Sequence, residues 1–292
     1  NAWRGIAWSP SLGLFAAVGS AGAGVATRIM TSPDGITWTL HNNPGWNHNW
    51  KCIAWSPELG LFAAVASGSN VTGGTRVMTS SDGINWTARN TPADNTWNAI
   101  AWSPALGLFA VVSSSGVGDR VMTSPDGITW TLRVSAKDNN WMGIAWSPTA
   151  AIFAAVANTN NTANKEVMTS VDGINWVEQF SGLNTWHGIA WSPGLGLFAA
   201  VAQGGAGNPK HIMTSPNGIS WTDQVAGDTD WSAIAWSTLA SVSVFAAVGQ
   251  VGAGLRVMTS PDGIIWTSRV SAADNDWEAI AWGGVPTPLA TD

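Results

Sequence analysis

The chain has 292 residues, with 12 basic and 18 acidic side chains and a formal net charge of −6. Charged residues make up 10% of it, against about 25% in an average globular protein. Because phosphate binding draws on a clustered excess of Lys and Arg, this composition argues against nucleic acid as a partner. No apolar run reaches 18 residues, so we expect no membrane insertion. The chain begins with neither a start methionine nor a signal peptide, and we expect it to be excised from a longer protein.

Two phrases alternate along the sequence. The first is of the type Ile-Ala-Trp-Ser-Pro-x-Leu-Gly-Leu-Phe-Ala-Ala-Val, and the second is of the type Val-Met-Thr-Ser-Pro-Asp-Gly-Ile-x-Trp. The Ala-Trp tryptophans of the first phrase recur every 44 to 47 residues, at Trp8, Trp55, Trp102, Trp146, Trp191, Trp236 and Trp282. A period of this length, made of strands, is typical of β-propeller blades.

The period predicts one domain over residues 1–282, followed by a Pro/Thr-rich tail over residues 283–292. The repeats cover about residues 3–49, 50–96, 97–140, 141–185, 186–230 and 231–276, with a partial repeat at 277–282.

Each unit contains four short β-type runs, which in the third unit cover residues 97–103, 108–112, 120–124 and 128–133. Gly, Pro, Asn or Asp interrupts the chain too often for a capped helix. The second run is apolar on both faces, as expected of a strand between neighbouring blades, and the fourth alternates like a half-exposed outer strand. We therefore predict an all-β, six-bladed β-propeller of four-stranded antiparallel blades.

A surplus seventh copy of the first strand is predicted at residues 277–282. In a six-bladed ring it competes with residues 3–8 for one inner position. Either one of the two is surplus and available to a neighbouring chain, or the parent protein continues beyond this sequence.

The turn between the third and fourth strands carries a repeated acidic or amide residue, at Asp34, Asp82, Asp126, Asp172, Asn217 and Asp262. An Asp or Asn side chain can accept hydrogen bonds from the backbone of its own turn, and the Gly that follows tolerates a left-handed conformation. We expect these residues to clasp the hairpin rather than to bind metal or to act in catalysis.

The Ser-x-Asp-x-x-x-Trp hairpin resembles the Asp-box, or BNR repeat, of sialidase-like propellers and of photosystem II assembly-factor propellers. The chain has one residue fewer between Asp and Trp than the usual Asp-box, as from Asp34 to Trp38. The resemblance implies a propeller fold whose hairpins lie away from the ligand face.

The same resemblance gives a test for enzymatic activity. Sialidases of this kind use three arginines, a carboxylic acid and a tyrosine nucleophile, whereas this chain has no tyrosine and its arginines mostly follow the repeat. The four histidines do not form a cluster with zinc-ligand spacing; only His41 and His48 share a loop, with Trp46 between them. We therefore predict that the chain is not an enzyme and needs no cofactor. Cys52, the one cysteine, is expected to be a small packing residue.

The loops that lead into each first strand are polar and end in tryptophan. The candidate ligand residues there are Trp50, Trp97, Trp141, Trp186, Trp231, Trp277, Asn49, Asn95, Asn139, Asn184, Asp228 and Asn275. These tryptophans either pack in the core or form platforms for a sugar ring, whose hydroxyls the Asn and Asp side chains would bind. The next residue varies from unit to unit, as expected of a channel mouth or of diverging pockets: Arg4, Lys51, Asn98, Met142, His187, Ser232 and Glu278.

These features lead to three hypotheses for function. The first is a non-enzymatic, lectin-like recognition module that binds carbohydrate or glycoconjugate through several similar sites and gains avidity from their number. The second is a structural or protein-binding scaffold that contacts one partner through its variable loops, which join the second strand to the third and each unit to the next. The third is a repetitive spacer in a larger surface or virion-associated protein, which favours an extracellular or surface location.

Overall fold

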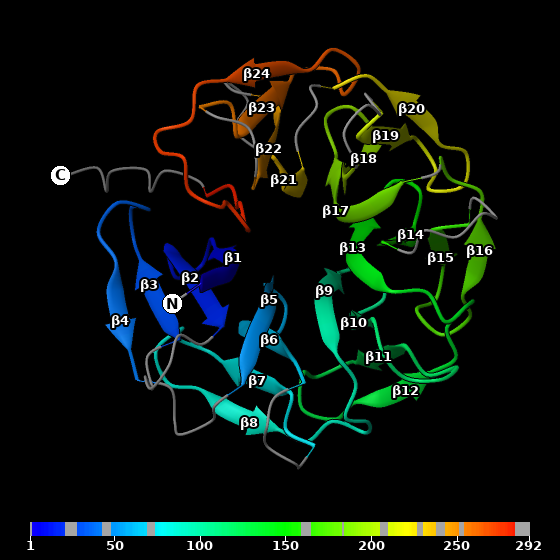
Figure 1. The fold of residues 1–292 in the computed structure, drawn as a ribbon. Coiled ribbons are helices and arrows are strands. Elements are labelled where there is room, and N and C mark those ends of the chain that lie inside the picture. Colours follow the sequence, from blue (N-terminus) through cyan, green and yellow to red (C-terminus); the bar gives the residue numbers. More distant parts are fainter. Residues whose placement is uncertain are drawn as a thin grey trace, which may run out of the picture.

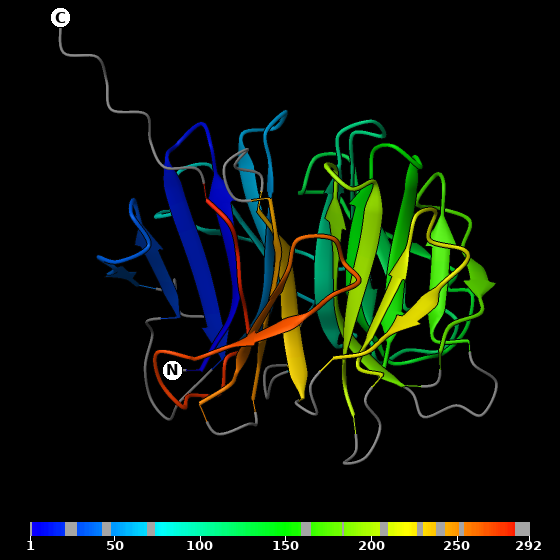
Figure 2. The ribbon, with the colours of Figure 1, turned by 90° about the horizontal axis from the view of Figure 1, so that it is seen from above.

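The computed structural model describes residues 2–20, 28–42, 48–68, 74–158, 165–182, 184–204, 210–226, 230–237, 243–250 and 254–283. This part of the chain contains 24 β-strands, which form six four-stranded antiparallel sheets, and it contains no helix that could cross a membrane. The sheets follow one another around a central axis in chain order, as the blades of a propeller (Figure 1). Figure 2 shows the same ring from its side. The predicted fold class is confirmed.

Blade 1 consists of β1 to β4, and each later blade takes the next four strands. The innermost strands are β1 (Ala2–Ser9), β5 (Asn49–Ser56), β9 (Trp97–Ser103), β13 (Trp141–Ser147), β17 (Thr185–Ser192) and β21 (Trp231–Trp236). The second strands are β2 (Leu14–Ser20), β6 (Leu61–Ser67), β10 (Leu108–Ser113), β14 (Ile152–Ala157), β18 (Leu197–Gln203) and β22 (Phe245–Gly249). The third strands are β3 (Ile29–Ser32), β7 (Val77–Ser80), β11 (Val121–Ser124), β15 (Val167–Ser170), β19 (Ile212–Ser215) and β23 (Val257–Ser260). The outermost strands are β4 (Thr39–His41), β8 (Thr87–Arg89), β12 (Thr131–Arg133), β16 (Val177–Gln179), β20 (Thr222–Gln224) and β24 (Thr267–Arg269).

The hydrophobic core lies between the blades. In five successive interfaces, Ala, Val and Ile side chains of one blade pack against Trp, Phe and Met side chains of the next. We call these two sides of a blade its aliphatic face and its aromatic face. Between blades 2 and 3, the aliphatic face consists of Ala63, Val65 and Val77, and the aromatic face includes Trp97, Phe109, Met122 and Trp130. The second strand supplies side chains to both faces, which explains why its sequence is apolar throughout.

A β-bulge near the start of each innermost strand leaves one residue unpaired beside the channel that these strands line. In blade 4 the register shifts between Trp141 and Gly143, so that Met142 is left out of the pairing. A Cβ atom on Gly143 would lie 2.8 Å from the carbonyl oxygen of His187 in the next blade. Only a small residue fits at this close approach, and the equivalent positions hold Gly5, Cys52, Ala99, Gly188 and Ala233. Burial raises the pKa of the Cys52 thiol, which disfavours the reactive thiolate.

The hairpin turn between the third and fourth strands is held by its Asp or Asn side chain. Asp126 Oδ1 accepts hydrogen bonds from the backbone N–H groups of Ile128 at 2.8 Å and Thr129 at 2.7 Å, and from the Ser124 hydroxyl at 2.9 Å. Gly127 adopts φ of 72°, and its carbonyl accepts the indole N–H of Trp130 at 3.1 Å. Each turn thus links a side-chain clasp to a tryptophan of the interblade core.

The same arrangement occurs in the other five turns. Asn217 Oδ1 replaces the carboxylate in blade 5 and accepts the N–H groups of Ile219 and Ser220 at 2.9 Å each. In blade 1, the N–H groups of Thr37 and Ile36 lower the pKa of Asp34 to about 2, because they stabilise the ionised carboxylate. The remaining members, Asp82, Asp172 and Asp262, accept the equivalent backbone hydrogen bonds.

Replacing Asp126 by Ala should lower the free energy of unfolding by about 1 kcal/mol, since two backbone N–H groups lose their acceptor. Asp126→Asn should change it by less than about 0.5 kcal/mol, because Asn217 shows that the amide oxygen serves equally in this turn. Urea unfolding of the two variants measures the difference. An equal loss in both would contradict the clasp and point to the charge instead.

The structure corrects the prediction of a surplus seventh strand. Residues 277–282 form no strand, but they lie between β21 and β1 beside the axis (Figure 1). The backbone N–H of Trp277 donates to the carbonyl of Gly249 at 3.2 Å. Residues 3–8 and 277–282 therefore do not compete for one position, since both adjoin the channel. The tail beyond residue 283 and residue Trp46 lie outside the described residues.

Candidate functional site

Five of the six candidate ligand tryptophans are enclosed in the interblade core. Trp50, Trp97, Trp141, Trp186 and Trp231 have 0% exposed surface. Trp277 is partly exposed, because no further blade packs against it in the described structure. This burial favours the packing interpretation of these indoles over the platform interpretation, and ligand contact through them would require the core to open.

The polar residues of the same loops bind the protein's own backbone. The side-chain amides of Asn95, Asn139 and Asn184 donate to the carbonyls of Asp119 at 3.0 Å, Lys165 at 2.8 Å and Lys210 at 2.6 Å. In blades 3, 4 and 5 these contacts tie the loop before the blade to the segment that enters its third strand. Asn49 is half-buried in β5, Asn275 is exposed, and Asp228 lies outside the described residues. Among the described residues, the predicted ligand residues do not gather into repeated pockets.

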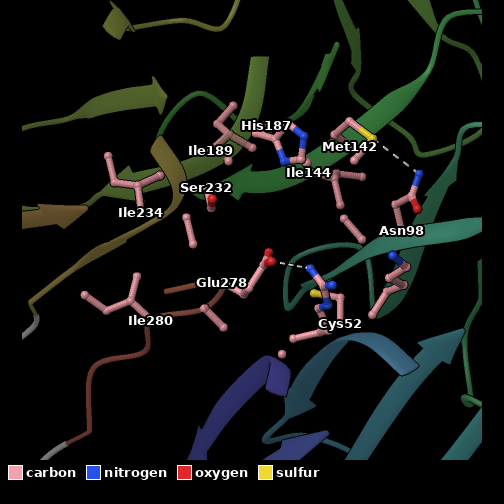
Figure 3. Close-up of a pocket in the computed structure, with 18 of the residues that line it drawn as sticks. Cys52, Asn98, Met142, Ile144, His187, Ile189, Ser232, Ile234, Glu278 and Ile280 are labelled. Carbon is pink, nitrogen blue, oxygen red and sulfur yellow. Dashed lines mark hydrogen bonds and ion pairs between the residues drawn. The ribbon is translucent and has the colours of Figure 1, made fainter. Parts of the chain in front are cut away.

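A cavity of about 220 Å³ lies instead on the axis, lined by the six innermost strands and by residues 278–280. Its mouth carries the residues that the β-bulges leave unpaired: Arg4, Lys51, Asn98, Met142, His187 and Ser232, joined by Glu278. Deeper in the channel the lining is aliphatic, with Ile6, Ile100, Ile144, Ile189, Ile234 and Ile280. Figure 3 shows Met142, His187, Ser232 and Glu278 around one space, with isoleucines beside them.

One ion pair crosses the mouth, between Arg4 and Glu278. Glu278 also accepts the side-chain amide of Gln250 at 2.8 Å. No hydrogen bond or salt bridge among the described residues satisfies the ammonium group of Lys51. Burial lowers the pKa of Lys51, and the nearby positive charge of Arg4 lowers it further. The mouth therefore holds two formal positive charges against one negative charge.

His187 faces the same space as a neutral imidazole at neutral pH. Burial lowers its pKa to about 4, and the charges of Lys51 and Arg4 act in the same direction. Its Nε2 lies 3.5 Å from the side-chain nitrogen of Asn158. Asn98 donates to the carbonyl of Trp141 at 2.9 Å, and its amide oxygen has no hydrogen-bond partner among the described residues.

The mouth can therefore offer hydrogen bonds from His187, Asn98 and Ser232 next to an excess positive charge. The described residues contain no group of three His, Cys, Asp or Glu side chains that could hold a metal ion. Sequence reasoning singled out the mouth residues only as variable neighbours of a repeated tryptophan. Their convergence on one site depends on the bulges and on the arrangement of the blades around one axis, which the sequence pattern does not display.

No protein-family model and no curated protein sequence matches the chain. Among solved structures, it is similar to virginiamycin B lyase from Staphylococcus aureus, with a TM-score of 0.75 and 13% identity over 97% of this chain and 89% of that one. A streptogramin B lyase gives a TM-score of 0.74 and 13% identity, over 96% and 87%. A chain of the mitotic checkpoint complex gives 0.66 and 13%, over 94% and 79%.

These similarities support the β-propeller fold, and no family match confirms the Asp-box resemblance. They also correct the prediction that the chain is not an enzyme, since two of the similar structures are lyases. Missing tyrosine argues against sialidase chemistry, but it does not exclude other reactions on this fold. At 13% identity the likeness concerns the fold alone.

The pKa of His187 predicts a pH dependence of stability. Its folded pKa of about 4 lies below the ordinary value of 6.5, so the unfolded chain binds more protons between these values. The contribution of His187 to the free energy of unfolding is therefore complete above pH 6.5. It falls as the pH drops toward 4, by about 2 kcal/mol between pH 7 and pH 4.5. Urea unfolding should show this loss in the wild type.

The control is His187→Gln, which cannot take up the proton and should show a loss smaller by about the same 2 kcal/mol. The clasp carboxylates do not contribute to this difference. The pKa of Asp34, for example, is lowered from 3.8 to about 2, so its carboxylate stays ionised at pH 4.5. Identical pH profiles for the two proteins would refute the burial of a neutral His187.

Proposed function

We propose that the chain is a recognition propeller that binds one small, polar organic anion in the mouth of its central channel. The observation that carries this proposal is Lys51, whose ammonium group faces the cavity without a hydrogen bond or salt bridge among the described residues. A partly buried cation of this kind is favourably placed for an anionic ligand, because partial desolvation strengthens the attraction.

The surroundings of Lys51 support a carboxylate ligand rather than a larger polyanion. Arg4 is already paired with Glu278, so the excess is a single positive charge. Neutral His187 and the amide of Asn98 can hydrogen-bond hydroxyl groups of the same ligand without adding charge. The isoleucines below would cover an apolar side of the molecule.

The lectin-like hypothesis takes a different form in this site. The buried indoles provide no repeated platforms, so we propose one central subsite for an acidic monosaccharide, with its carboxylate toward Lys51. Multivalent binding around the ring is not part of this proposal.

A second candidate is a protein-binding scaffold, and exposed aliphatic side chains on the opposite side of the disc favour it. The exposed leucines of the first turns are Leu12, Leu59, Leu106 and Leu195, and the exposed isoleucines of the clasp turns are Ile36, Ile84, Ile128, Ile174, Ile219 and Ile264. In an up-and-down blade both turns share one side, so these residues lie on one face of the disc, which we call the apolar face. Exposed apolar surface of this kind is typical of interfaces with macromolecules.

Isothermal titration with D-glucuronate, D-glucose and acetate tests the channel site. We expect one saturable site for glucuronate, weaker or no binding of glucose, and a loss of at least tenfold in affinity for Lys51→Met. The loss follows from removing a charged hydrogen-bond donor of about 1.5–3 kcal/mol. Lys210→Met is the matched control, because Lys210 pairs with Asp223 on the outer surface, and its affinity should equal that of the wild type.

Equal affinity of wild type and Lys51→Met would contradict the proposed site. If none of the three compounds binds at millimolar concentration, the carbohydrate form of the proposal fails, and the apolar face becomes the leading surface for a protein partner.

A further inference from the structure

Five interfaces of the ring join faces of opposite kind, and two faces remain without such a partner. Blade 1 has an aromatic face that no preceding blade covers, and blade 6 has an aliphatic face that no following blade covers. No hydrophobic cluster of the described residues joins blade 6 to blade 1.

Burial differs at these two faces from all equivalent positions. Trp3, Phe15 and Met30 of blade 1 are partly exposed, whereas the tryptophan, phenylalanine and methionine at these places in blades 2 to 6 are fully buried. On blade 6, Ala246 and Val257 are partly exposed, whereas their counterparts in the other blades have 0% exposed surface.

Residues 277–282 lie between these faces and repeat the sequence of an innermost strand, Trp-x-Ala-Ile-Ala-Trp. Glu278, Ala279 and Ile280 line the channel at the level of the corresponding residues of the six blades. On the side toward blade 6, Trp277 donates to Gly249. Toward blade 1, Gly283 contacts the ring of Phe15. In the described structure no strand pairs with this segment, although each of the six innermost strands pairs with a second strand.

We infer that the gap between blades 6 and 1 is a docking site for a three-stranded element with this repeat's own sequence, which would complete a seventh blade on residues 277–282. Its second strand would pair with the free edge of that segment. Its aromatic face would pack on Ala246 and Val257, and its aliphatic face would pack on Trp3 and Phe15. This inference does not depend on the proposed ligand.

The existing interfaces argue for this occupant. Both exposed faces have the composition that is complementary to a repeat unit, and such units already pack face to face at the five interfaces between successive blades. A second copy of the chain lacks a spare unit to donate, because each of its six sheets is already four-stranded. Strand addition to a sheet edge provides main-chain hydrogen bonds, while the side chains on alternate faces provide specificity.

A binding experiment can use residues 103–133 of this chain as the probe, carried on a soluble fusion partner. This segment holds the second, third and fourth strands of blade 3 with both of their turns. We expect a 1:1 complex with the full chain by light scattering, and slower hydrogen exchange in residues 277–283. The fusion partner alone should not bind.

Ala246→Asp places a charge on the exposed aliphatic face and should weaken the complex at least tenfold. Val117→Asp is the control, since Val117 is exposed on blade 3, and it should bind the probe like the wild type. Absence of a complex with the wild-type chain would overturn the inference. So would equal binding by Ala246→Asp, or self-association of the chain that Ala246→Asp abolishes, because the faces would then serve copies of the chain instead.

Discussion

Packing of an aromatic face on an aliphatic face is the contact on which the whole ring depends. A buried tryptophan removes about 150–250 Å² from water, which is worth about 4–6 kcal/mol at ~25 cal/mol/Å². Trp97 and its counterparts occur once in each interface, so the stability of a blade comes mainly from its neighbours. The chain therefore behaves as a repeat array bent into a ring, in which blades 2 to 5 are stabilised by a blade on either side and blades 1 and 6 by one neighbouring blade each.

This contact also explains the difference between the repeated and the variable positions. Side chains between the blades must fit the same interface each time, and the clasp of Asp126 fixes the turn beside Trp130. The bulged residues point to the axis, where no blade constrains them. Arg4, Lys51 and His187 can therefore differ from one another and together form one asymmetric site on a symmetric scaffold. The proposed single ligand would occupy this asymmetric site.

The sequence predicts the fold well, because strand lengths, turn residues and the period are all local patterns. Successive apolar residues such as Phe62 and Ala63 make their strand apolar on both faces, which already indicates a strand between two blades. The site was less accessible to prediction. Whether Trp141 is a platform or a core residue depends on how tightly the preceding blade packs against it, and the convergence of Lys51 and His187 depends on the arrangement of the blades around one axis. The role of residues 277–282 was equally hard to predict, because their position beside β1 follows only from the arrangement of the blades in space.

The central claim is that each blade is stabilised by packing on its neighbours, so that blades 1 and 6, with one uncovered face each, are less stable locally than the blades between them. Native-state hydrogen exchange of the free chain tests it most directly. The account predicts that amides of β10 and β14 exchange only through global unfolding, whereas amides of β22 and of residues 277–282 exchange through smaller openings. Equal protection of β10, β22 and β2 would contradict it, because a ring with uniform protection has no open side.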